Sequence, residues 1–136
     1  MLFEIEKQCF SCEAFSKQQI AYLLADYNAV GLEARVGEEL VGFVIGRIDV
    51  NRTMPFGHII TLDVLPAYRR RGIAKQLMRS IEAVFHERGI KECRLEVRED
   101  NEAALGLYHK LGYDQIGKME SYYGNGNGLY LKKPLG

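Results

Sequence analysis

The first third of the chain combines helical spacing of apolar residues with strand-like alternation. Apolar residues recur at helical spacing over 17–24, and a second helical segment is expected over 3–10. Leu32–Val36 alternates between apolar and polar residues, Gly37–Glu39 has the composition of a turn, and Leu40–Ile48 is mostly apolar. Two such runs joined by a short turn predict a β-hairpin.

The middle of the chain predicts a helix between two strands. Asn51–Gly57 contains a proline and is expected to be a loop. Ile59–Leu65 is an apolar run with polar residues inserted at a period of two, which predicts a strand. Gly72–Arg88 carries apolar residues at helical spacing and ends before Gly89, so it is the clearest helix of the chain. Cys93–Arg98 alternates strictly and predicts the next strand.

The last third predicts one more helix and a closing hairpin. Asn101 can cap a helix over Glu102–Lys110. Tyr113–Tyr122 is expected to be a strand, 124–128 is a glycine-rich turn, and Leu129–Leu131 is the final strand. This order of elements predicts an α+β fold with a mixed, mostly antiparallel sheet, whose centre is a parallel β-α-β unit.

Length and composition restrict the classes of function. The 136 residues are enough for one domain, spanning 1–136, and too few for two. The 18 basic and 18 acidic side chains give a net charge of zero, which argues against salt-driven nucleic-acid binding. No apolar run approaches the ~20 residues that a membrane span needs. We therefore expect neither a nucleic acid nor a membrane as partner.

The cysteines indicate a reduced thiol population. Cys9, Cys12 and Cys93 are an odd number, which is typical of a cytoplasmic protein without a disulfide framework. Cys9 and Cys12 have the spacing of half a metal site, but no second pair of Cys or His residues follows at metal spacing. We expect both to be packing residues, with redox chemistry as the alternative, and we expect no metal.

The stretch from Leu62 to Lys75 carries the clearest candidate chemistry. A strand stops at Pro66, a turn of three arginines follows, and a helix begins at Gly72. Backbone N–H groups and the positive end of the helix then point at one spot, which suits a phosphate. The preceding strand offers an edge to an extended ligand arm. The alternative is a solvated basic loop before an ordinary helix, because short glycine motifs often match by chance.

The sequence of Leu95–Tyr113 favours the phosphate-binding interpretation. It resembles the Asn…Ala…Leu-Tyr-x-x-x-Gly-(Phe/Tyr) pattern of the GNAT superfamily of acetyl-CoA-dependent N-acetyltransferases. Arg69, Gly72 and Ala74 match the (Arg/Gln)-x-x-Gly-x-(Gly/Ala) signature of the same family. The resemblance covers about 9–131 and is closest to the protein N-terminal acetyltransferases of the ribosomal-protein-alanine type. It implies the GNAT fold and acetyl-CoA as cosubstrate.

The resemblance implies a role for each matching position. The backbone of Leu62–Val64 would pair with the pantetheine arm, with the N–H of Val64 at a β-bulge polarising the thioester carbonyl. Asn101 would hydrogen-bond the arm, Tyr108 would lie beside the sulfur, and the N–H groups of 70–75 would hold the pyrophosphate. The residues expected to contact acetyl-CoA are Leu62, Asp63, Val64, Arg69, Arg70, Arg71, Gly72, Ile73, Ala74, Lys75, Asn101, Ala104 and Tyr108.

Two residues are the candidate catalysts for direct attack of an amine on the thioester, with both substrates bound together. Tyr108 would protonate the departing thiolate. The alternative interpretation is that Tyr108 is an aromatic residue that only packs in the core. Glu96 would be the base. Alternatively, Glu96 is only a charged residue on a strand face, neutralised by the arginines two positions to either side, or the base acts through water. His58 and Asp63 are further candidates near the same site, with His58 expected in a loop.

The last hairpin suggests the acceptor. Tyr122 and Tyr123 precede Gly-Asn-Gly-Asn-Gly, and similar paired tyrosines occur in protein N-terminal acetyltransferases. The resemblance implies that they grip a peptide, with Tyr27 in the opposing wall, so the acceptor would be the α-amino group of a protein N-terminus. The alternatives are two aromatics that shield the hairpin end, an enzyme for lysine or small-molecule amines, and a non-catalytic module that binds acetyl-CoA.

The start of the chain departs from the family pattern. GNAT chains usually open with a strand before their first helix, and here only Met1 and Leu2 precede a helical segment. We expect either that the N-terminal strand is missing or that Met1 is not the natural start. An exposed sheet edge beside Leu32–Val36 would favour pairing between chains, which leaves both a monomer and a dimer open.

Overall fold

The structure is a computed structural model, and it describes residues 28–120 and 126–136. The helices predicted over 3–10 and 17–24, and the expected absence of an opening strand, fall outside these residues.

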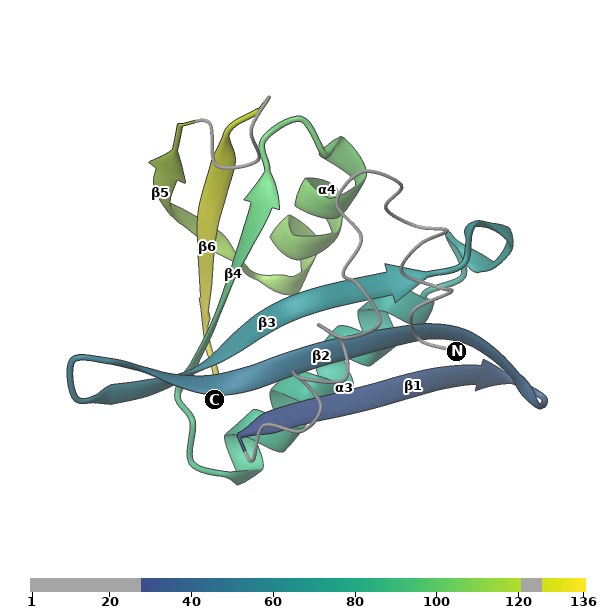
Figure 1. The fold of residues 1–136 in the computed structure, drawn as a ribbon, viewed down its shortest axis with the longest axis horizontal. Helices are drawn as coiled ribbons and strands as arrows, with labels where there is room; N and C mark the ends of the chain where they lie inside the picture. The colour runs from purple at the N-terminus through teal and green to yellow at the C-terminus, as the bar shows by residue number, and fades with distance from the viewer. Residues whose placement is uncertain (1–27, 121–125) are drawn as a thin grey trace.

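The described residues form one mixed sheet with helices (Figure 1). The strand order is β1-β2-β3-β4-β6-β5, and the β3–β4 pair is parallel while the other described pairs are antiparallel. This confirms the predicted α+β architecture with a parallel β-α-β unit at its centre. The elements are β1 (Ala29–Val36), β2 (Glu39–Asn51), β3 (Met54–Val64), a 3-10 turn η1 (Pro66–Tyr68), α3 (Ile73–Glu87), β4 (Glu92–Arg98), α4 (Glu102–Leu111), β5 (Asp114–Met119) and β6 (Gly128–Pro134).

The hairpin of β2 and β3 is longer than the sequence suggests. The loop expected over 51–57 is wrong, because β3 already begins at Met54 and Pro55 pairs with Val50 of β2. Pro55 is tolerated since β3 pairs with β4 only from Gly57 onward, so one side of the strand does not need the missing N–H there.

Helix α3 covers one face of β1, β2 and β3 (Figure 1). Two glycines allow this close packing. A Cβ atom at Gly46 would lie 2.8 Å from the ring of Phe85, and one at Gly57 would lie 2.5 Å from the same ring. Because Gly46 faces α3, the residues at odd positions of β2 face the opposite side of the sheet.

A buried acid ties α3 to the C-terminal part of the chain. Glu82 accepts hydrogen bonds from the hydroxyl of Tyr113 at 2.7 Å and from the ammonium of Lys133 at 2.7 Å. Cys93 lies in the same core, and burial raises its pKa to about 12, so this thiol is a packing group. No helix in the described part of the chain is long and apolar enough to cross a membrane.

The sheet divides at its centre, and this division positions the site. β3 and β4 pair only from Gly57 with Cys93 to Ile59 with Leu95. Beyond these pairs the two strands diverge, and we call this divergence of β3 and β4 the fork (Figure 1).

Candidate active site

The edge of β3 at the fork carries outward-facing backbone groups. The N–H of Leu65 bonds the carbonyl of Val41 at 2.8 Å, so this pair is a hydrogen-bonded rung of the antiparallel ladder. Such rungs alternate with pairs whose backbone groups point away from each other. The backbone groups of Leu62 and Val64 therefore point away from β2, toward the fork, as expected for a strand that pairs with an extended ligand arm.

The expected position of the β-bulge is wrong. Thr61 pairs with Ile45 and Ile59 pairs with Gly46, so the extra residue is Ile60 and not Val64. The bulge has a consequence for the site. It places His58 on the same face of the sheet as Thr61, although a strict period of two would put them on opposite faces.

The turn after β3 forms a backbone cradle. Arg70 and Gly72 have left-handed φ angles of 63° and 80°, and α3 begins at the next residue. The amide of Gln76 makes the first bond of the helix, to the carbonyl of Gly72 at 3.0 Å, so the N–H groups of Ile73–Lys75 precede the helical ladder. Among the described residues, no side chain caps Gly72, the first turn of α3 holds no acid, and a Cβ at Gly72 would meet nothing within 4 Å. This open, positive helix end fits a phosphate group.

Two of the three arginines stabilise the turn. The Nε of Arg69 donates to the carbonyl of Val64 at 3.1 Å, and the guanidinium of Arg71 lies 5.0 Å from the ring centre of Tyr68. Arg70 is exposed. The cofactor contacts assigned to 69–75 remain a prediction that this geometry accommodates.

Helix α4 positions two further candidates. The side-chain oxygen of Asn101 accepts the N–H of Ala104 at 3.1 Å, which confirms the predicted helix cap and leaves the amide nitrogen of Asn101 as its donor. Tyr108 is 8% exposed, and its ring meets that of Tyr113 edge-on at 5.7 Å. Tyr108 belongs to the same core as Leu95 of β4.

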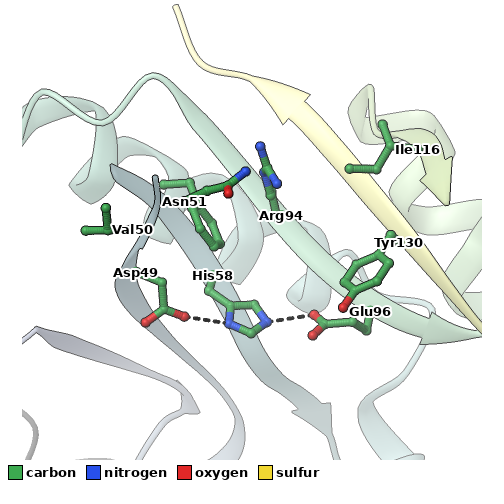
Figure 2. A pocket seen from close by; sticks show the side chains of 9 residues that line it. Asp49, Val50, Asn51, His58, Arg94, Glu96, Ile116 and Tyr130 are labelled. Atoms are coloured by element: carbon green, nitrogen blue, oxygen red, sulfur yellow. Dashed lines mark hydrogen bonds and ion pairs between the residues drawn. The ribbon is translucent and has the colours of Figure 1, made fainter. Parts of the chain in front are cut away.

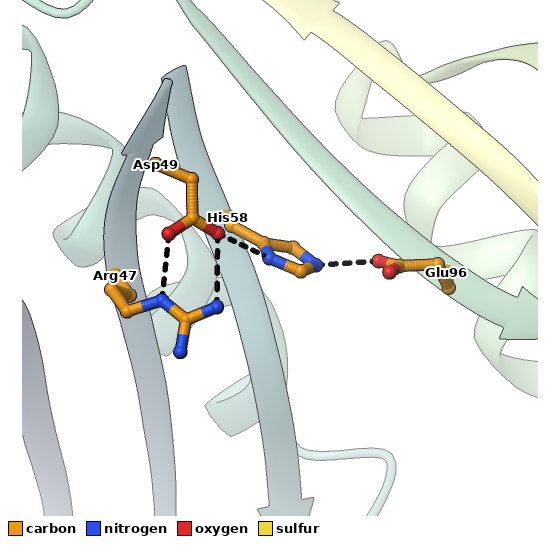
Figure 3. Close-up of polar contacts among 4 residues, drawn as sticks. All are labelled: Arg47, Asp49, His58 and Glu96. Atoms are coloured by element: carbon orange, nitrogen blue, oxygen red, sulfur yellow. Dashed lines mark hydrogen bonds and ion pairs between the residues drawn. The ribbon is translucent and has the colours of Figure 1, made fainter. Parts of the chain in front are cut away.

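Glu96 lies on the other face of β4, since the odd positions of this strand are buried and the even ones are not. Its carboxylate is 2.6 Å from Nε2 of His58, and Nδ1 of His58 is 2.8 Å from the carboxylate of Asp49 (Figure 3). Asp49 in turn accepts two hydrogen bonds from Arg47, at 2.7 and 3.1 Å. Glu96 and Tyr108 therefore lie on opposite faces of the sheet.

The arginines that flank Glu96 in sequence have other partners. Arg94 donates to Glu92 at 2.7 Å and Arg98 donates to Asp100 at 2.9 Å. The partner of Glu96 is His58, and the expectation that His58 lies in a loop is wrong, because it is an interior residue of β3.

The charges around His58 shift its titration and that of Asp49. Burial lowers the pKa of His58, but hydrogen bonds and charge from Glu96 and Asp49 outweigh burial and raise the pKa above its usual value. Burial raises the pKa of Asp49, yet Arg47 and His58 outweigh it and hold the pKa below its usual value. Because each ring nitrogen faces a carboxylate oxygen, protonated His58 donates to both acids.

An open groove of about 520 Å³ reaches the contact between His58 and Glu96 (Figure 2). Its walls combine exposed apolar side chains with the hydrogen-bonded side chains of Asp49, His58 and Glu96. The lining residues are Asp49, Val50, Asn51, Phe56, His58, Arg94, Glu96, Ile116 and Tyr130.

Asp63, the other candidate acid, is buried on the face away from α3, opposite Phe43. It is 2% exposed and accepts the hydroxyl of Thr61 at 2.8 Å. Its second carboxylate oxygen has no hydrogen-bond partner among the described residues.

Three predicted acceptor residues, Tyr27, Tyr122 and Tyr123, lie outside the described residues. Within the described ranges, no group of three or more His, Cys, Asp or Glu side chains could hold a metal ion.

Sequence and structure comparisons converge on one family. Residues 1–113 match the acetyltransferase (GNAT) family. An N-alpha-acetyltransferase of Sulfurisphaera tokodaii is 34% identical over 117 residues, which cover 79% of this chain and 70% of the relative. N-alpha-acetyltransferase 30 of Schizosaccharomyces pombe is 33% identical over 119 residues, covering 87% of this chain and 79% of the relative.

A solved structure, the NatC complex bound to Gag peptide and CoA, contains a chain that is 27% identical to this one. It superposes with a TM-score of 0.84 and covers 99% of this chain and 91% of its own. The predicted family, its fold and an acetyl-CoA-dependent N-acetyltransferase activity are confirmed, and the chain belongs to the GNAT family of acetyltransferases.

Proposed function

We propose that this enzyme acetylates the α-amino group of protein N-termini, by direct transfer with both substrates bound. The observation that carries the proposal is the arrangement at the fork. Glu96 with His58 lies on one face of the sheet, the buried Tyr108 lies on the other, and the edge of β3 points its backbone into the space between the strands. The relatives named N-alpha-acetyltransferase, and the neighbour solved with a peptide and CoA, support this choice of acceptor.

The cradle and the fork fit acetyl-CoA, which supplies the acetyl group as an activated thioester. The N–H groups of Ile73–Lys75 would hold the pyrophosphate, because in the described part of the chain they lie at a helix start with no side-chain cap and no acid in its first turn. The backbone of Leu62 and Val64 would pair with the pantetheine arm. Asn101 would donate its amide N–H to the same arm while its oxygen caps α4.

The two faces divide the proton transfers. Glu96 and His58 would accept the proton that the amine must lose before it can act as a nucleophile. The phenol of Tyr108 would donate a proton to the sulfur that departs on the opposite side. An α-amine has a pKa of about 7.7–8.0, against about 10.4 for lysine, so a base of moderate strength suits the α-amine better.

The proposal is tested with purified enzyme, acetyl-CoA and two peptides of one sequence. One peptide has a free α-amine and no lysine, and the other has a blocked α-amine and one lysine. We expect thiol release and a mass increase of one acetyl group with the first peptide, and loss of this activity in Glu96→Gln. Turnover of the second peptide alone, or of neither, would overturn the proposal.

A further inference from the structure

We infer that Asp49, held by Arg47, is a positioning residue that keeps a proton on Nδ1 of His58 and thereby directs Nε2 to act with Glu96 as the proton acceptor. The inference deepens the proposed function and rests on it. Asp49 touches neither substrate in this account, since it acts through His58.

The geometry around Asp49 leaves its carboxylate one role. Arg47 lies two residues away on β2, and two N–H groups of its guanidinium grip both carboxylate oxygens, at 2.7 and 3.1 Å (Figure 3). The oxygen that faces His58, 2.8 Å from Nδ1, belongs to a carboxylate that stays ionised and can only accept a hydrogen bond. Nε2 also faces a carboxylate, that of Glu96, but Arg47 holds the negative charge of Asp49 in place, so the neutral ring keeps its proton on Nδ1 rather than on Nε2.

This constraint fixes the tautomer of neutral His58. With its proton on Nδ1, the neutral ring has its lone pair on Nε2, and Nε2 faces Glu96 at 2.6 Å. An N–H bond of the acceptor's ammonium breaks, and its electron pair stays on the amine nitrogen for the attack. The proton enters the contact between Nε2 of His58 and the carboxylate of Glu96.

The groove gives this proton a way out. The fork begins beyond Ile59 and Leu95, and the contact between His58 and Glu96 lies beside it. Both residues also line the open groove, which extends along Asp49 toward the tip of the β2–β3 hairpin (Figure 2). Water in the groove can take up the proton after each turnover.

The other charged and titratable groups around His58 do not replace Asp49. Among the described residues of the neighbouring elements, these groups are Arg47 of β2, Arg94 and Glu96 of β4, and Tyr130 of β6. Arg94 is engaged by Glu92 and lies 4.9 Å from the ring centre of Phe56. Tyr130 is the register partner of Glu96 on the far side of the groove from Asp49.

The test compares Asp49→Asn with Asp49→Glu and with a matched control. In Asp49→Asn, Arg47 takes the amide oxygen and the NH2 group faces Nδ1, which moves the ring proton of neutral His58 to Nε2. Asp49→Glu restores the carboxylate. Glu33→Gln removes a carboxylate that bonds an arginine two residues away, at 3.0 Å, on the remote strand β1.

The first measurement is 15N NMR of the imidazole, which needs no acceptor peptide. The chain has three histidines, so His58→Gln assigns the signals. At a pH high enough to make His58 neutral, we expect the Nδ1–H tautomer in the wild type, in Asp49→Glu and in Glu33→Gln, and the Nε2–H tautomer in Asp49→Asn. The Nδ1–H tautomer in Asp49→Asn would overturn the inference.

The second measurement is the pH profile of kcat/KM for a peptide with a free α-amine. We expect kcat in Asp49→Asn to fall roughly 10²–10⁴-fold, with an acidic limb at lower pH and an unchanged KM for acetyl-CoA. We expect Asp49→Glu to recover most of the rate. An equal loss in Glu33→Gln, or an unmoved acidic limb, would overturn the inference. The tautomer switch without any peptide acetylation would support the positioning role and overturn only the proposed function.

Discussion

Replacing Gly72 by valine should abolish binding of acetyl-CoA while the fold survives. Gly72 has a φ of 80°, and a Cβ there would meet nothing within 4 Å, so the cost to the free protein is the left-handed backbone alone. This conformation costs a residue other than glycine roughly 1–2 kcal/mol. At about 3–5 °C per kcal/mol for a chain of this size, the melting temperature should fall by about 3–10 °C.

The effect on binding should be larger, because the new side chain would fill the space in which we propose that the phosphates bind. Each hydrogen bond lost to a charged group costs about 1.5–3 kcal/mol, or roughly 10- to 150-fold in affinity. Loss of two or more such bonds would put binding beyond detection by calorimetry.

Gly89→Val is the matched control for this experiment. Gly89 follows the other end of α3, has a φ of 81°, and a Cβ there would also meet nothing within 4 Å. Both variants should lose similar stability by thermal unfolding, and only the change at Gly72 should lose acetyl-CoA by calorimetry. Wild-type affinity in Gly72→Val, or equal losses of affinity in both, would refute the assignment of the cradle.

Three further predictions concern chemistry, packing and pH. Tyr108→Phe should lower kcat by roughly 10²–10⁴-fold with acetyl-CoA affinity nearly unchanged, and a wild-type rate would make Tyr108 a packing residue. Gly57→Ala should destabilise the protein by about 1–3 kcal/mol in urea unfolding, because the new Cβ would lie 2.5 Å from Phe85. Gly106→Ala is the control on α4: among the described residues its Cβ would meet nothing within 4 Å, so it should stabilise the protein slightly. The pKa of His58 is raised in the folded protein, so its interactions with Glu96 and Asp49 stabilise the fold fully below about pH 6.5. This stabilisation is lost as pH rises through the folded pKa, and His58→Gln should therefore be more destabilising at pH 6 than at pH 9.

The sequence predicts the β-α-β unit well because local signals agree there. The helix over Gly72–Arg88 has periodic apolar positions and a glycine at each end, and α3 spans Ile73–Glu87. The strand over Cys93–Arg98 alternates strictly, and β4 spans Glu92–Arg98. Local patterns do not say, however, that β6 lies between β4 and β5, because strand order depends on contacts between distant segments.

Sequence patterns miss the row of charged side chains at the candidate site, formed by Arg47, Asp49, His58 and Glu96. Pro55 suggests a loop just before His58, yet at Pro55 the strand has no β4 partner on one side, so β3 continues through the proline to His58. Arg47 and Asp49 share one face of β2, but the strand predicted from the sequence ends at Ile48 and leaves Asp49 outside it. Their meeting with His58 depends on the bulge at Ile60, an irregularity that no periodicity reveals.

The central claim, transfer of an acetyl group to an α-amine, is tested most directly by competition within one peptide. A peptide with both a free N-terminal α-amine and an internal lysine is incubated with the enzyme and acetyl-CoA to low conversion, and fragment-ion mass spectrometry locates the acetyl group. The account predicts acetylation on the α-amine with at least about a tenfold preference, equivalent to about 1.4 kcal/mol in transition-state free energy. Acetylation mainly on the lysine would contradict it.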